Sequence, residues 1–226
     1  MKSLLRISTL IGMLHVVIVH ADDSLPSQRE YEPKDGKGRV AVLISGQTGA
    51  SNYTEVAKSI ADQGFYVVLV DGNDFWIKGG GGEALLKGVI KHAQESPRAL
   101  PDKVGVVGFS LGGASALTYA ARMPDLVGTV VAQYPMTNFI TDPAGFVARI
   151  QVRTLILAGT FDTYKGCCLI EMARKLNEAA KAGAASALLE LHEYPGGDHG
   201  FTTNASKRRD LASDAVSRTV DRLRQY

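Results

Sequence analysis

Residues 103–113, KVGVVGFSLGG, decide the fold that we predict for this chain. They begin with a short apolar run, which is typical of a strand buried on both faces, and they lead into a small-residue segment at 111–122 that favours a helix. Between the two lies Gly108-Phe109-Ser110-Leu111-Gly112. Side chains larger than hydrogen two residues before and after the serine would collide in a sharp turn. The stretch therefore predicts a strand–turn–helix unit with Ser110 in the turn.

The rest of the chain alternates between short apolar runs and longer amphipathic segments. Such alternation predicts an α/β fold, in which a mostly parallel sheet is covered by helices on both faces. No repeat or change in composition divides the sequence, so we expect a polar lead-in at 22–38 and one domain at 39–226. We place strands at 39–44, 66–70, 103–107, 128–132, 153–158 and 188–194, and helices at 53–63, 83–94, 111–122, 169–182 and 207–224.

Residues 1–21 have the layout of a secretory signal peptide. Lys2 and Arg6 accompany an apolar run, and Val19-His20-Ala21 supplies small or modest side chains before a cleavage point. The apolar run is about 13 residues long, whereas a membrane-spanning helix needs roughly 20. We expect cleavage after Ala21 and a secreted or periplasmic protein. A buried first helix or an uncleaved anchor is the alternative.

The charge of the chain argues against one class of function. The 226 residues have a formal net charge of +2, and Lys2 and Arg6 account for it because residues 1–21 contain no acid. Basic and acidic residues balance in the remainder, which therefore gives no sign of the clustered basic surface of a nucleic-acid-binding protein. We expect no nucleic-acid partner and no stable insertion of the mature chain into a membrane.

Candidates for chemistry follow the strands, because ligands bind beyond the carboxyl ends of the strands in a parallel sheet. A serine hydroxyl at position 110 needs a base, and His199 lies in a loop just past the last predicted strand. The imidazole needs a carboxylate to orient it, and Asp162 follows the strand before that one. Asp198 is a rival for this role. We predict Ser110 as nucleophile, His199 as base and Asp162 as the orienting acid.

Other candidate site residues lie in the loops around Ser110. The backbone N–H of Leu111 directly follows the serine, and that of Gln47 lies in the loop after 39–44, so both are candidates for binding an oxyanion. Trp76 and Tyr134 also follow strands and are candidates for contact with a substrate. Core packing is the alternative for both aromatic residues.

The order of these motifs resembles that of the α/β-hydrolase fold and, within it, the dienelactone hydrolase family. Residues 108–113, Asp162 and Gly197-Asp198-His199-Gly200-Phe201 carry the resemblance, which covers nearly all of the sequence from about Arg39 onward. The short segment between Tyr134 and Arg153 also resembles that group and leaves no room for a large cap domain. The resemblance implies a Ser/Asp/His hydrolase that cleaves a small-molecule ester or lactone through an acyl-enzyme. No metal or organic cofactor is implied.

The serine at position 110 departs from the founding enzymes of that family, which carry cysteine there. Ser110 looks more like the nucleophile of generic carboxylesterases and of the catalytic domains of some peptidases on this fold. A peptidase or acyltransferase therefore remains an alternative. So does a catalytically silent binding protein, because a fold alone does not determine function.

Cys167 and Cys168 are the only cysteines, and they are neighbours. Exported proteins usually place cysteines so that disulfides join separate segments, and adjacent cysteines can close only a small ring. We therefore expect two packed thiols, with a disulfide between them as the alternative. The sequence has no cysteine and histidine spacing typical of a metal site.

Overall fold

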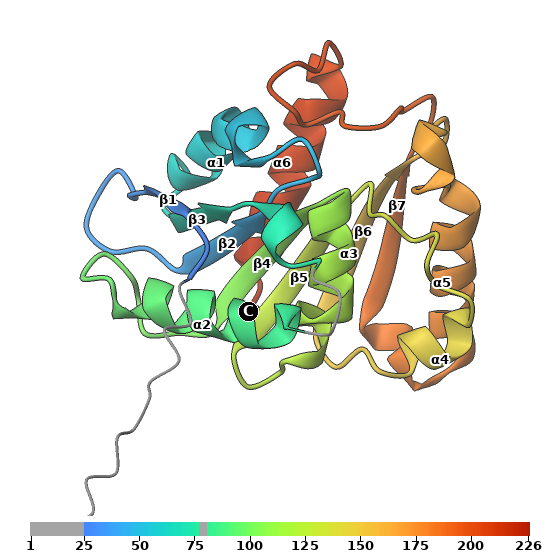
Figure 1. Cartoon of the computed structure of the whole chain (residues 1–226), viewed down its shortest axis with the longest axis horizontal. Coiled ribbons are helices and arrows are strands. Elements are labelled where there is room, and N and C mark those ends of the chain that lie inside the picture. Colours follow the sequence, from blue (N-terminus) through green and yellow to red (C-terminus); the bar gives the residue numbers. More distant parts are fainter. Residues whose placement is uncertain (1–24, 77–80) are drawn as a thin grey trace, which may run out of the picture.

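The computed structural model describes residues 25–76 and 81–226, so the expected signal peptide at 1–21 lies outside the described residues. Its sheet has the strand order β1-β3-β2-β4-β5-β6-β7 (Figure 1). Neighbouring strands are parallel except β1 and β3, which are antiparallel. The strands are β1 (Gln28–Tyr31), β2 (Val40–Ile44), β3 (Tyr66–Val70), β4 (Val104–Phe109), β5 (Val127–Gln133), β6 (Arg153–Gly159) and β7 (Leu189–Tyr194).

Helices cover both faces of the sheet, as Figure 1 shows. On one face lie α1 (Thr54–Ala61) and α6 (Arg209–Leu223). On the other lie α2 (Gly82–Glu95), α3 (Leu111–Thr118), α4 (Pro143–Val147) and α5 (Ile170–Ala182). Short 3-10 turns connect them at Ala50–Tyr53, Gly72–Asp74, Ala120–Arg122, Tyr164–Gly166 and Ala184–Ala187.

Strand β2 illustrates why these sequences form a doubly covered sheet. Its residues are at most 1% exposed. Val42 and Ile44 join the core beneath α2, α3 and α5, whereas Leu43 joins the core beneath α1 and α6. Because alternate side chains of a strand point to opposite faces, a continuous apolar run supplies both cores. The sheet and its helices confirm the predicted α/β fold.

The structure corrects the predicted boundaries in three places. Strand β1 lies within the segment 22–38 that we expected to be a polar lead-in without a strand. Helix α4 was not predicted, and α3 ends at Thr118 rather than continuing as an α-helix to 122. The residues of β1, Gln28-Arg29-Glu30-Tyr31, are polar because the strand lies at the sheet edge with no residue buried.

The described connection between β5 and β6, at the carboxyl edge of the strands, is short. Between β5 and β6 the chain forms only α4 and irregular turns, so the described structure has no cap domain inserted at this point. In the ranges 25–76 and 81–226, no helix is long and apolar enough to cross a membrane.

Candidate active site

Ser110 occupies a sharp turn between β4 and α3. Its backbone has φ 51° and ψ −111°, a conformation that residues with a side chain rarely adopt. A Cβ atom on Gly108 would lie 2.2 Å from the carbonyl oxygen of Gly112, and one on Gly112 would lie 2.1 Å from that of Ile44. The two glycines therefore let the strand, the turn and β2 approach closely, and the turn holds the serine at the start of α3.

His199 joins Ser110 to Asp162 through its two ring nitrogens. Nε2 lies 3.0 Å from the Oγ of Ser110, and Nδ1 lies 2.7 Å from Oδ2 of Asp162. The carboxylate side chain of Asp162 is fully buried, whereas the His199 side chain is 16% exposed. His199 is thus within hydrogen-bond distance of both other predicted residues, and its side chain is partly exposed to solvent.

The ends of β6 and β7 bring Asp162 and His199 together. The N–H of Phe161 donates to the carbonyl of Gly197 at 2.8 Å, next to the histidine loop. A Cβ atom on Gly159 would lie 2.3 Å from the same carbonyl oxygen, so glycine is needed for this approach. Hydrogen bonding between the two loops therefore fixes the distance between the carboxylate and the imidazole.

Tyr164 is a further part of the site that sequence reasoning missed. Its backbone N–H donates to Oδ1 of Asp162 at 3.1 Å, so both carboxylate oxygens have a partner. Its ring stacks on the imidazole of His199, with centroids 4.5 Å apart and planes 5° from parallel. The one available signal was its position two residues after Asp162, and an aromatic residue at that spacing does not by itself predict contact with the histidine.

Tyr134 supports the site from below and does not line the cavity, contrary to the prediction that it contacts substrate. Its side chain is fully buried and its hydroxyl lies 2.6 Å from Oγ1 of Thr202. Its ring packs edge-on against His199 at 5.0 Å. Burial raises the pKa of Tyr134 well above its usual value, and that of Tyr53 is also raised by burial. Burial therefore disfavours ionisation of both phenols, and the Tyr134 ring is in contact with His199.

The two predicted oxyanion donors lie in the wall of one cavity with Ser110. Within the described part of the chain, neither the N–H of Leu111 nor that of Gln47 donates to a protein acceptor. Gly46 lets the Gln47 loop approach, because a Cβ there would collide with the Tyr53 hydroxyl and would lie 3.2 Å from the Cβ of Ser110. The side-chain amide of Asn73 donates to the carbonyl of Gln47 at 3.2 Å and so helps to hold this loop in place. Sequence reasoning did not identify Asn73.

The cavity beside Ser110 has a volume of about 420 Å³. Trp76, a predicted substrate contact, is 38% exposed in its wall and packs edge-on against Phe139 at 5.0 Å. Among the lining residues that the structure describes, Lys165 is the one with a charged side chain. The residues that line the cavity are Gln47, Asn73, Trp76, Ser110, Leu111, Met136, Asn138, Tyr164, Lys165 and Cys167.

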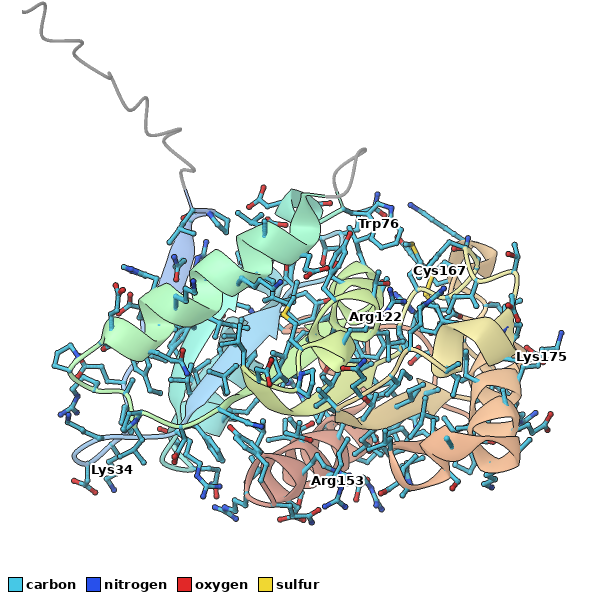
Figure 2. All side chains as sticks on the ribbon, turned by 90° about the horizontal axis from the view of Figure 1, so that it is seen from below. Lys34, Trp76, Arg122, Arg153, Cys167 and Lys175 are labelled. Atoms are coloured by element: carbon cyan, nitrogen blue, oxygen red, sulfur yellow. A yellow bond between two sulfur atoms is a disulfide. The ribbon has the colours of Figure 1, made fainter. Side chains whose placement is uncertain are left out.

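Cys167 and Cys168 form a disulfide with each other, so the expectation of two free thiols is wrong. Cys168 is buried, and Cys167 lines the cavity. Figure 2 shows Trp76 and Cys167 on the same side of the molecule, away from Arg153 at the start of β6. The turn Tyr164–Gly166, with Lys165 and Gly166 at positive φ, brings the pair to the cavity, and nothing in the residue pattern indicates this turn.

Cys167, Cys168 and His199 also form the one group within the described ranges whose side-chain atoms are close enough to share a metal ion, at 4.8 Å or less from one another. Metal ligation by cysteine needs a thiolate, which a disulfide does not offer. His199 has hydrogen-bond partners at both nitrogens. The donor set in this oxidised form therefore does not suit a metal ion.

Asp198, the rival acid, is exposed next to His199. Among the hydrogen bonds of the described residues, none joins its carboxylate to the imidazole, whereas Asp162 is bonded to it. The two remaining described histidines pair with other acidic residues. His92 lies exposed on α2 near Glu95, and His192 of β7 faces Asp214 of α6. The geometry therefore gives His199 one carboxylate partner, Asp162.

Known structures share this fold. A candidate dienelactone hydrolase from Klebsiella pneumoniae has a TM-score of 0.72 and 20% identity, covering 88% of this chain and 92% of its own. Thermogutta terrifontis esterase 2 has a TM-score of 0.69 and 17% identity, with 86% and 87% covered. Est1E from Butyrivibrio proteoclasticus has a TM-score of 0.66 and 15% identity, with 86% and 93% covered.

The sequence itself matches the profile of the dienelactone hydrolase family over residues 81–226, which is more than half of the chain. A comparison with curated proteins finds no match. The matched range contains Ser110, Asp162 and His199. The chain therefore belongs to the dienelactone hydrolase family and is a hydrolase of the carboxylesterase type.

Proposed function

We propose that this protein hydrolyses carboxylic esters or lactones through an acyl-enzyme, with Ser110 as nucleophile, His199 as general base and Asp162 as the orienting acid. The observation that carries the proposal is the bridging position of His199. Its Nε2 is 3.0 Å from the hydroxyl that must lose a proton, and its Nδ1 is 2.7 Å from a buried carboxylate. A nucleophile, a base and a group that orients the base are the parts that serine acyl transfer requires.

In the first step, Ser110 Oγ attacks the ester carbonyl while His199 Nε2 takes the hydroxyl proton. Asp162 accepts a hydrogen bond from Nδ1, which keeps Nε2 free to act as base and stabilises the imidazolium that forms. The oxyanion is bound by the N–H groups of Leu111 and Gln47, which have no acceptor among the residues that the structure describes. His199 then donates its proton to the leaving alcohol, and the acyl group stays on Ser110.

In the second step, water replaces the alcohol. His199 removes a proton from a water molecule, whose oxygen attacks the acyl carbonyl, and the same N–H groups bind the new oxyanion. Collapse of this intermediate returns the proton from His199 to Ser110 Oγ and releases the acid. The His199 side chain is 16% exposed, so a water molecule can reach it in this step.

The cavity supports substrates with an apolar or aromatic group. Four large apolar side chains of the described residues are exposed, namely Trp76, Phe161, Tyr164 and Leu169. Trp76 and Tyr164 line the cavity, and the other two belong to the same 161–169 segment as Tyr164. Because Trp76 and Tyr164 are exposed apolar side chains in the cavity wall, they indicate a surface that binds an apolar group. Among the structural neighbours, Est1E was solved with ferulic acid bound.

Covalent labelling tests the proposed nucleophile. A fluorophosphonate probe is expected to modify the folded protein once, at Ser110, because attack on phosphorus uses the same nucleophile and base. Such chemistry is known for a neighbour, Thermogutta terrifontis esterase 2, which paraoxon phosphorylates. Mass spectrometry of the peptide that contains Ser110 measures the adduct, and heat-unfolded protein is the control. A folded protein that takes up no label would instead be a silent binding protein.

We also propose that residues 1–21 direct export and are removed. The support is the sequence pattern of Lys2, Arg6 and the apolar run before Ala21. Mass spectrometry of the protein recovered outside the cytoplasm is expected to show an N-terminus at Asp22. Recovery of exported protein that still begins at Met1 would contradict the cleavage.

A further inference from the structure

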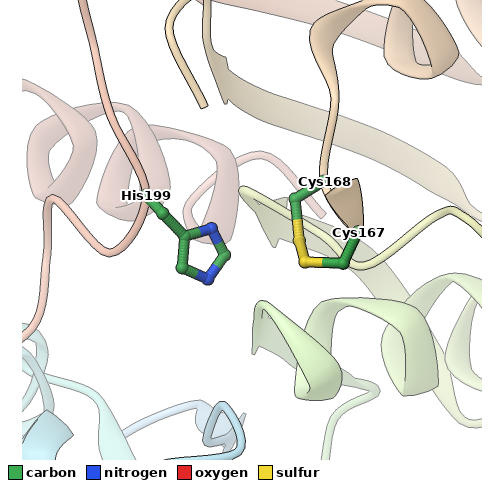
Figure 3. Close-up of side chains that lie close together, drawn as sticks. All are labelled: Cys167, Cys168 and His199. Atoms are coloured by element: carbon green, nitrogen blue, oxygen red, sulfur yellow. A yellow bond between two sulfur atoms is a disulfide. The ribbon is translucent and has the colours of Figure 1, made fainter. Parts of the chain in front are cut away.

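The disulfide between Cys167 and Cys168 lies directly beside the reacting groups. The sulfur atoms of the pair and a ring nitrogen of His199 lie within 4.8 Å of one another. Figure 3 shows the imidazole facing the disulfide from a separate segment of the chain. Cys167 and Ser110 also line the same cavity, in which the substituents of a carbonyl group attacked by Ser110 would lie. The disulfide is therefore in position to contact substrate.

The backbone of Cys167 connects two segments of the cavity wall. Its carbonyl accepts hydrogen bonds from the N–H groups of Thr137 at 2.8 Å and Asn138 at 3.1 Å, in the loop after β5. Its own N–H donates to the carbonyl of Tyr164 at 3.0 Å. Asn138 and Tyr164 both line the cavity, and Tyr164 stacks on His199. A shift of the Cys167 backbone would therefore move both the loop that contains Asn138 and the turn that contains Tyr164.

The covalent bond makes this part of the wall stiff. Two cysteine side chains that are free can each change rotamer, whereas a bond between their sulfur atoms removes that freedom. Burial of Cys168, at 3% exposure, anchors the pair in the protein. We propose that the Cys167–Cys168 disulfide determines specificity by limiting the size of the group accepted beside Ser110, a role that presupposes the ester hydrolysis proposed above.

The test compares two esters in one enzyme. The double substitution Cys167→Ala and Cys168→Ala is expected to raise the ratio of kcat/KM for p-nitrophenyl octanoate to that for p-nitrophenyl acetate by about tenfold, since pocket contacts with a few methylenes discriminate on this scale. The ratio does not depend on how much of the sample is folded. A purely structural disulfide would lower both values by the same factor and leave the ratio unchanged.

Reduction of the wild-type enzyme provides the same comparison without a mutation. A water-soluble phosphine breaks the S–S bond, and with one water molecule it gives two thiols and the phosphine oxide. The ester ratio is expected to shift in the same direction as in the double variant and to return when oxidised glutathione restores the bond. The double variant, which has no sulfur at these positions, is the matched control and is expected not to respond to the phosphine.

The outcomes distinguish failure of the specificity role from failure of the proposed ester hydrolysis. An ester ratio unchanged by reduction of the folded wild-type enzyme, as judged by circular dichroism, overturns the specificity role even if the double variant does not fold. Wild-type protein that hydrolyses neither ester overturns the proposed function itself. A shift of the ratio in reduced enzyme, reversed by reoxidation, supports the disulfide as the wall that selects the substrate.

Discussion

Substitution of Ser110 by alanine is expected to lower kcat for ester hydrolysis by about 10⁴- to 10⁶-fold, because residues that act as one catalytic unit lose nearly everything when the nucleophile is removed. The Oγ of Ser110 is the atom that lies 3.0 Å from His199 Nε2. Without it His199 has no hydroxyl to deprotonate, and no acyl-enzyme can form. Initial rates with p-nitrophenyl esters of increasing chain length measure the loss.

The alanine variant is expected to fold like the wild type, which makes the kinetic comparison clean. The backbone contacts of the turn, such as the N–H of Ser110 with the carbonyl of Gln133 at 3.0 Å, do not involve the hydroxyl. Thermal unfolding followed by circular dichroism checks this. Activity near that of the wild type would refute Ser110 as nucleophile, and a wild-type enzyme that prefers aminoacyl-anilides to esters would make the protein a peptidase.

Substitution of Asp162 by asparagine is expected to lower kcat by about 10⁴-fold, a magnitude known for this change in other serine hydrolases. An asparagine can donate a hydrogen bond to His199 Nδ1, which places the imidazole proton on Nε2. In that tautomer Nε2 points a proton at Ser110 and cannot act as base. Since Asp162 also accepts the N–H of Tyr164, the asparagine needs its oxygen on that side, which reinforces the wrong tautomer.

Asp198→Asn is the matched control for this prediction. It removes a carboxylate that lies next to His199 in the sequence but is exposed and has no hydrogen bond to the imidazole within the described structure. The kcat of this variant is expected to stay close to that of the wild type. A larger loss from Asp198→Asn than from Asp162→Asn would reverse the assignment of the orienting acid. The kcat of both variants is measured over the full pH range, so that a shift of the pH optimum is not mistaken for a loss of activity.

The parallel strands were predictable because burial on both faces demands continuous apolar runs such as Val40–Ile44. The predicted site residues follow from the same arrangement, since the carboxyl ends of parallel strands meet at one edge and bring distant loops together. Strand β1 was not predictable in this way. Its backbone pairs with β3, but none of its four residues is buried, so the strand lacks the continuous apolar run that marks the others.

The surroundings of the site depend on loop conformations that a residue pattern does not encode. Tyr164 reaches His199, and Cys167 reaches the cavity, because Lys165 and Gly166 adopt positive φ in the turn between them. The buried position of Tyr134 has a similar cause, because its own φ of 36° turns the chain so that the ring enters the core. Positive φ is rare outside glycine, so residue type gives little indication of it.

The positive φ of Ser110 lowers the stability of the folded protein, so another residue at this position would give a more stable chain. Holding a residue with a side chain in such a conformation costs of order 1–3 kcal/mol, and glycine would relieve most of it. Every folded copy carries this cost, whether or not substrate is present. Selection for heat resistance alone would therefore favour chains that have lost the serine, and any search for hardier variants of this enzyme must keep residue 110 unchanged.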